Sequence, residues 1–95
     1  NPYWVPELRP KTGLSSDVAS YVMAQAGASE FIDRVEELLV GMAPGYLREG
    51  KKQVTVAVGC TGGKHRSTAI SEELSARLAA RGHRTAVLHR DLGKE

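Results

Sequence analysis

The sequence has little cysteine, few aromatic residues and no long hydrophobic run, and each shortage excludes a class of protein. A single cysteine in 95 residues cannot form an intrachain disulfide, which favours a reducing compartment, and we expect a cytoplasmic location. No run of about 18 apolar residues is present, so no membrane span is predicted. No histidines, cysteines or acidic residues have metal-ligand spacing, so we predict no metal site.

The N-terminus also lacks two features. Residues 1–6 have neither the basic start nor the apolar stretch of a signal peptide, and no initiating methionine is present. We therefore expect one domain, residues 1–95, taken from a longer protein.

Charge is distributed unevenly along the chain. Residues 1–47 carry three basic and six acidic residues, a net charge of −3, whereas residues 48–95 carry ten basic and five acidic residues, a net charge of +5. The positive half therefore favours an anionic partner such as a phosphorylated metabolite, a nucleotide or RNA.

The periodicity of apolar residues predicts three helices. The first runs from Ser15 or Ser16 to about Gly27, and the second from Ser29 to Pro44-Gly45. The third runs from about Arg66 to Arg81, with Gly82 as its terminator. The expected buried stripe of the second helix consists of Phe31, Val35, Leu38, Leu39 and Met42.

Two short apolar runs predict β-strands. Val54–Val58 is rich in β-branched residues and barely alternates, which is typical of a strand buried on both faces. Thr85–Leu88 predicts a second strand. With the helix between them they would form a βαβ unit at residues 54–88, so we expect an α/β fold with a small, mostly parallel sheet flanked by helices.

The most informative segment is the glycine-rich turn at residues 59–67, Gly-Cys-Thr-Gly-Gly-Lys-His-Arg-Ser. Glycines 62 and 63 would let the backbone approach a ligand, and a helix start presents unpaired N–H groups with partial positive charge. Arg66 can hold two phosphate oxygens. The predicted anion-binding residues are Thr61, Gly62, Gly63, Lys64, His65, Arg66 and Ser67.

The turn has three other interpretations. A Walker P-loop is excluded by the spacing of its glycines and by His65, which follows Lys64 where that motif has Ser or Thr. A cysteine-dependent phosphatase is the alternative, because Cys60 and Arg66-Ser67 spell C-x5-R-S at a helix start, which would lower the pKa of the thiol. The remaining interpretation is a buried turn that binds no ligand and whose charged side chains face solvent.

The run Gly59 to Ser67 closely resembles the C-terminal domain of the RapZ family of RNase adapter proteins, also called YvcJ-like nucleotide-binding proteins. The opening Asn1-Pro-Tyr-Trp4, the Leu8-Arg9-Pro10 and Thr12-Gly13-Leu14 segments, and the tail around residues 89–92 fit the same family. The resemblance extends over nearly the whole chain.

The resemblance implies a non-catalytic sensor domain with a fold similar to a phosphofructokinase substrate-binding subdomain. Its expected ligand is glucosamine-6-phosphate or a related amino-sugar phosphate or nucleotide-sugar. Thr61, Gly62, His65 and Arg66 would contact the phosphate, and Arg9 and Asn1 are weaker candidates for the sugar. No cofactor is expected in this domain, since ATP and GTP would bind an N-terminal P-loop domain that is absent here.

The resemblance also implies larger partners: a small RNA, an RNase and further copies of the chain, with no membrane association. The RNA-binding candidates are Arg77, Arg81, Arg84 and Arg90. The tail is less basic than in enteric members, because His83 follows Gly82 and the chain ends Gly93-Lys94-Glu95.

Overall fold

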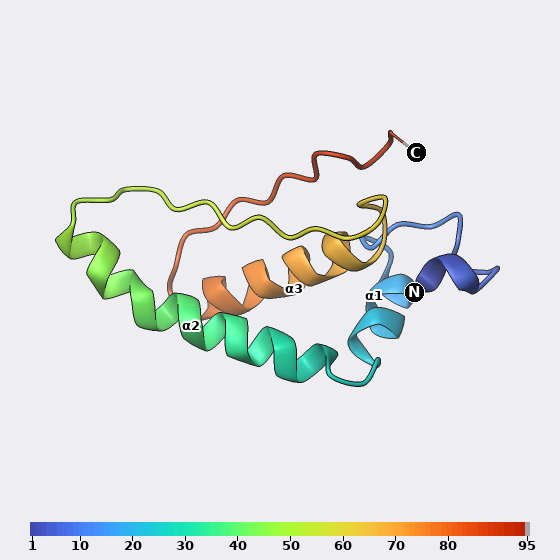
Figure 1. The fold of residues 1–95 in the computed structure, drawn as a ribbon, viewed down its shortest axis with the longest axis horizontal. Coiled ribbons are helices and arrows are strands. Elements are labelled where there is room, and N and C mark those ends of the chain that lie inside the picture. Colours follow the sequence, from blue (N-terminus) through green and yellow to red (C-terminus); the bar gives the residue numbers. More distant parts are fainter. Residues whose placement is uncertain (95) are drawn as a thin grey trace.

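The computed structural model describes residues 1–94, and these residues are helical with no β-strand. A short 3-10 turn, η1, opens the chain, and three α-helices follow (Figure 1). Their bounds are η1 Pro2–Trp4, α1 Ser16–Met23, α2 Ala28–Arg48 and α3 Arg66–Ala80. The expected α/β fold with a parallel sheet is therefore wrong, although all three helices are confirmed.

The two predicted strands are extended segments without sheet pairing. Among residues 1–94, no backbone–backbone hydrogen bond involves residues 52–59 or 84–90. Val54 and Val56 are each 45% exposed, and Leu88 is 90% exposed. The β-branched composition indicates a preference for extended backbone, but a strand also requires a partner that accepts and donates hydrogen bonds. Residues 54–58 and 85–88 have the preference for extended backbone, but residues 1–94 provide no strand that pairs with them.

The core lies where the N-terminal residues, α1 and the first half of α3 meet. Leu8, Val18, Val22 and Ala69 form its buried cluster, and Ile70 packs against it. Fully burying an aliphatic side chain of this kind stabilises a fold by about 1.5–3 kcal/mol. The core is thus small, and it lies at the end of the molecule where α3 begins (Figure 1).

Both long helices end in the same left-handed glycine motif. In α2, Gly50 has φ +77° and the Lys51 N–H donates to the Tyr46 carbonyl at 3.0 Å. In α3, Gly82 has φ +89° and the His83 N–H donates to the Leu78 carbonyl at 3.0 Å. These bonds satisfy carbonyls that a helix end leaves unpaired. Gly82 is confirmed as the terminator of α3.

The expected bounds of α1 and α2 were partly wrong. Pro44 lies inside α2, and the helix continues because Gly50, not Gly45, adopts the left-handed conformation that closes it. Gly27 does not end α1, which stops at Met23; it is the N-cap of α2, with φ +85°, in place of the expected Ser29.

The buried face of α2 differs from the predicted stripe. Ile32 is 1% exposed, whereas Phe31 is 54% exposed and Leu38 and Met42 are also exposed. The face toward α3 includes Glu36, which pairs with Arg77 of α3 and with Arg81 at the C-cap of that helix. Helical periodicity was therefore correct, but the chosen face was rotated by about one residue. None of the helices within residues 1–94 combines the length and apolarity needed to cross a bilayer.

Candidate anion-binding site

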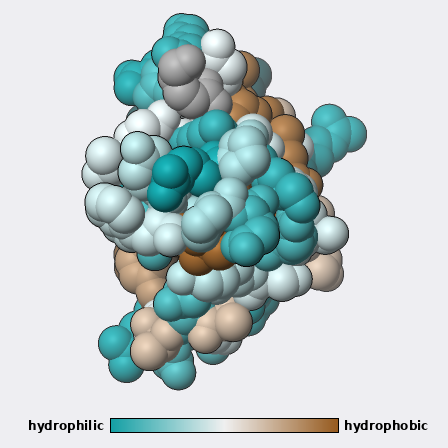
Figure 2. All heavy atoms as spheres, turned by 90° about the vertical axis from the view of Figure 1, so that its right-hand side faces the viewer, coloured by the Kyte–Doolittle hydropathy of each residue, from teal (hydrophilic) through white to brown (hydrophobic). Residues whose placement is uncertain are grey.

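The glycine-rich turn leads directly into the first residue of α3. Gly62 and Gly63 have φ of +81° and +68°, a conformation that side-chain-bearing residues rarely adopt. The Thr68 hydroxyl donates to the Gly63 carbonyl at 3.2 Å, which ties the turn to the helix. Thr61 and Gly62 lie on the exposed surface of the turn. Figure 2, which views this end of the molecule, shows a largely hydrophilic surface with apolar side chains at its edges.

Arg66 begins α3 and carries an unpaired buried atom. Its Nε is the one buried side-chain nitrogen or oxygen within residues 1–94 that has no hydrogen-bond partner. A buried donor without an acceptor costs about 1–3 kcal/mol, more when it is charged. An acceptor that reaches this atom would remove that cost.

Cys60 lies at the base of the turn. Its Sγ accepts the Ser67 backbone N–H at 3.2 Å and lies 3.3 Å from the Ser67 hydroxyl. Burial raises the pKa of the Cys60 thiol, but hydrogen bonds from Ser67 and Gly63 and the charge of Arg66 lower it. The net pKa lies below the ordinary value. The helix start therefore stabilises negative charge at the position of this sulfur.

His65 is directed into the protein and not toward solvent. The side chain is buried, and its Nε2 lies 3.1 Å from the Arg9 carbonyl. Because a carbonyl can only accept, Nε2 carries the proton in this contact. The second ring nitrogen can donate to an anion only when the ring is protonated. The His65 side chain is therefore better placed to link the turn to the N-terminal segment than to donate a hydrogen bond to a phosphate.

The two N-terminal candidates for the sugar are used locally. The Asn1 side chain accepts the Tyr3 N–H at 3.1 Å as the cap of η1. The Arg9 guanidinium lies 4.6 Å from the centre of the Tyr3 ring, and its Nε donates to the Tyr3 carbonyl at 2.6 Å. Trp4, which packs edge-on against Tyr3, is mostly exposed. The Asn1 and Arg9 side chains thus both bind the backbone of Tyr3.

Asp91 is a site neighbour that sequence reasoning missed. A Cβ built on Gly63 would lie 3.0 Å from the Asp91 Cβ, so the two residues are in contact. Arg90 donates to both Asp91 carboxylate oxygens at 3.0 Å and holds the pKa of Asp91 below its usual value. An ionised carboxylate thus lies against the turn, and it offsets part of the positive potential there. The contact was not predicted because Gly63 and Asp91 are 28 residues apart in the sequence.

A hollow close to the site does not suit an anion. It is lined by Gly13, Leu14, Ala19, Ala69, Glu72 and Glu73. Its two carboxylates would repel phosphate. The exposed residues of the turn, Thr61 and Gly62, lie outside this acidic hollow. No group of three or more potential metal ligands is found within residues 1–94.

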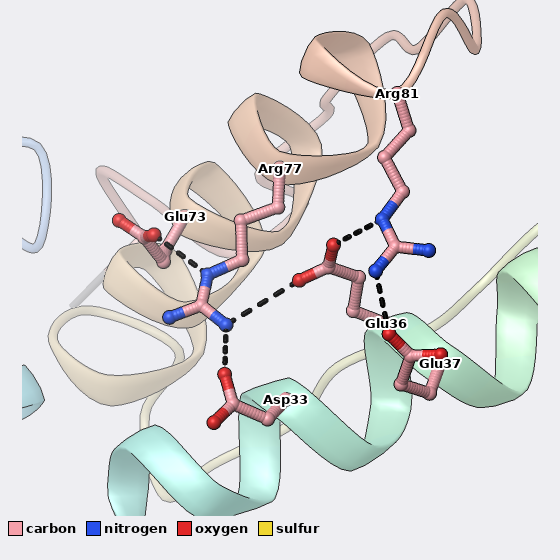
Figure 3. Close-up of polar contacts among 6 residues, drawn as sticks. All are labelled: Asp33, Glu36, Glu37, Glu73, Arg77 and Arg81. Carbon is pink, nitrogen blue, oxygen red and sulfur yellow. Dashed lines mark hydrogen bonds and ion pairs between the residues drawn. The ribbon is translucent and has the colours of Figure 1, made fainter.

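Three of the four RNA-binding candidates, Arg77, Arg81 and Arg90, form ion pairs with acidic residues. Arg77 donates to Glu73 at 2.9 Å and pairs with Asp33, and it lies 3.4 Å from Glu36 (Figure 3). The hydrogen bond to Glu73 has the largest effect on the pKa of Arg77, followed by the one to Asp33, and both raise it above its ordinary value.

Arg81 is paired in the same network. Its Nε lies 2.7 Å from Glu36, and its guanidinium also donates to Glu37 at 2.5 Å (Figure 3). Arg77 of α3 and Arg81, the C-cap residue of that helix, thus join α3 to α2, and acidic residues of α2 balance their charges there. Arg84 and Arg90 are exposed, and Arg90 is paired with Asp91.

Comparison with known proteins places this chain in a family. A sequence model described as the RapZ C-terminal domain matches residues 1–93. The chain belongs to the RapZ C-terminal domain family. It is 96% identical over its whole length to a nucleotide-binding protein of Cutibacterium acnes and 67% identical to one of Streptomyces coelicolor. A nucleotide-binding protein of Nocardioides sp. is 59% identical over the same 95 residues.

This RapZ-family chain spans about one third of the length of these relatives. It covers 33% of the Cutibacterium protein and 32% of the Streptomyces protein. The resemblance drawn from the glycine-rich turn and from the Asn1 to Leu14 segment is thus confirmed at the level of the family.

Proposed function

We propose that this RapZ C-terminal domain is a non-catalytic sensor that binds a phosphorylated amino sugar, glucosamine-6-phosphate or a related compound, at the turn of residues 61–67. The observation that carries the proposal is the buried, unpartnered Nε of Arg66. It lies at a helix start beside two left-handed glycines, where backbone donors and a guanidinium can meet one oxyanion.

The proposal includes the wider protein. The sensor would report to a nucleotide-binding part of the longer protein, in the cytoplasm, and would act as an adapter within a homo-oligomer. The names of the relatives support nucleotide binding in that longer protein. ATP or GTP would bind outside this domain.

The test is a titration of glucosamine-6-phosphate, and separately of inorganic phosphate, by calorimetry. Arg66→Ala should weaken binding by about 1.5–3 kcal/mol, the magnitude of a hydrogen bond to a charged group. Arg48→Ala is the matched control, because it removes the same charge at the far end of α2, and its affinity should equal that of the wild type. Equal affinity of the two variants would remove Arg66 from the site.

A cysteine-dependent phosphatase is the second candidate, and the Ser67–Cys60 contact favours it. The thiolate would attack phosphorus, the ester P–O bond would break with its electrons on the leaving oxygen, and water would then cleave the P–S bond to release phosphate. Asp91 cannot protonate the leaving group, because Arg90 keeps it ionised. We therefore expect activity only toward esters whose leaving groups need no proton.

The probe for this candidate is p-nitrophenyl phosphate. Turnover that disappears in Cys60→Ser would establish the enzyme, whereas absence of turnover in the wild type excludes it. Ser67→Ala separates the two roles of the turn: it should raise the pKa of Cys60 toward its ordinary value, measured as the pH dependence of alkylation by iodoacetamide.

A further inference from the structure

Residues 1–13, which we call the N-terminal strap, contact the anion-binding turn through main-chain atoms. The Gly13 N–H donates to the Lys64 carbonyl at 2.9 Å. The Arg9 carbonyl accepts from His65 Nε2 at 3.1 Å. The strap thus attaches to the two residues that directly precede Arg66.

Gly13 fits against α3 with no space for a side chain. A Cβ at this position would lie 2.4 Å from the His65 carbonyl oxygen and 2.5 Å from the Ala69 nitrogen. These are backbone atoms of the turn and of the first helical turn of α3, so they cannot move aside without displacing the site. No other glycine of the described chain is packed as closely.

Side-chain and backbone contacts hold the strap together. Pro2 is buried, the Arg9 guanidinium lies over the Tyr3 ring, and Leu8 belongs to the core. The Lys11 N–H donates to the Leu8 carbonyl at 3.0 Å, which continues this structure toward Gly13. Gly13 and the Arg9–His65 contact therefore belong to one short ordered segment.

We propose that Gly13 is a positioning residue: it fixes the strap, and through the strap it holds the turn in the conformation that binds an anion. This inference rests on the proposed anion-binding function. Because thermodynamic coupling is reciprocal, an anion at the turn must in return stabilise the strap on α3. The strap is thus the element that relates occupancy of the site to the N-terminal end of this domain.

The first test compares Gly13→Ala with Gly41→Ala in the 95-residue protein. Gly41 lies in α2 with nothing within 4 Å of its Cβ position, so its substitution should leave affinity unchanged. Gly13→Ala should weaken phosphate binding by about tenfold or more, within the usual range of coupling between sites. A folded Gly13→Ala protein that binds phosphate like the wild type overturns the inference.

The second test needs no variant, which matters if Gly13→Ala does not fold. Hydrogen exchange of the Gly13 amide is measured in wild-type protein with and without phosphate. At 100 times the dissociation constant, exchange through opening of the strap should slow by up to about 100-fold. The Phe31 amide, at the start of α2, serves as the internal control and should not respond beyond any global stabilisation.

The outcomes separate the two proposals. Phosphate binding that requires Arg66 but leaves the Gly13 amide unprotected supports the proposed function and overturns the role of the strap. Phosphate binding with protection of that amide supports both. No phosphate binding to the wild-type protein overturns both.

Discussion

Two regions of this molecule are built differently from similar apolar material. In the first, the strap, α1 and the start of α3 pack around Leu8, Val18 and Ala69, and Gly13 lies against the backbone of α3. In the second, the extended segments at residues 52–59 and 84–90 expose valine and leucine to solvent, with no backbone hydrogen bond among residues 1–94. Apolar content alone therefore does not determine burial. A side chain is buried where a second element can reach it.

The largest expected difference between the two regions comes from one leucine substitution made in each. Leu8→Ala removes a core side chain that is 8% exposed and should lower the free energy of unfolding by about 2–4 kcal/mol. Leu88→Ala, in the exposed segment, should change it by no more than about 0.5 kcal/mol. Urea unfolding monitored by circular dichroism measures both.

The comparison fails if the two leucine variants are equally destabilised. That result would mean that Leu88 is buried in solution and that the extended segments have a packing partner.

A smaller effect is expected where α2 joins α3. Glu36 is largely buried and pairs with both Arg77 and Arg81, so Glu36→Gln should destabilise the protein by about 1–2 kcal/mol. Glu37→Gln makes the same change at an exposed carboxylate that contacts only Arg81 among these arginines, and it should cost less than about 0.5 kcal/mol. Thermal unfolding at low and high salt distinguishes the two, since salt should weaken only the exposed pair.

The smallest effect is expected at the exposed start of α1. Hydrogen bonds from Lys11 and Ser15 lower the pKa of Asp17 to about 2 from 3.8. A carboxyl with a lowered folded-state pKa contributes stability above its unfolded pKa, and this contribution is lost as the pH falls through about 2. NMR titration should give a midpoint near 2, and Lys11→Met should move it toward 3.8. An unchanged midpoint in that variant would exclude the Lys11 contact.

How much the sequence could predict follows from the range of each interaction. Gly82 was recognisable as a terminator because a left-handed glycine acts on the carbonyls of its own helix. Pro44-Gly45 misled because proline weakens a helix without ending it when a better terminator, Gly50, follows. Val54 to Val58 misled more, since strand composition does not reveal whether a partner strand is present.

The same distinction applies to the site. The left-handed glycines, the helix start and the position of Arg66 were predictable, because they depend on neighbours in sequence. The inward direction of His65 was not, because its partner, the Arg9 carbonyl, is 56 residues away. Asp91 was missed for the same reason. A pattern of residue types within one segment identifies local conformation, but it does not identify which distant backbone atom completes it.

The proline inside α2 has a consequence for how the molecule comes apart. Pro44 has no N–H, so the Val40 carbonyl lacks its helical donor and the last turns of α2 are attached less firmly than the rest. That stretch also projects away from the core (Figure 1). We therefore expect limited proteolysis to cut first between Tyr46 and Lys52, where trypsin can use Arg48, Lys51 and Lys52. The fragment left intact would contain the glycine-rich turn and α3.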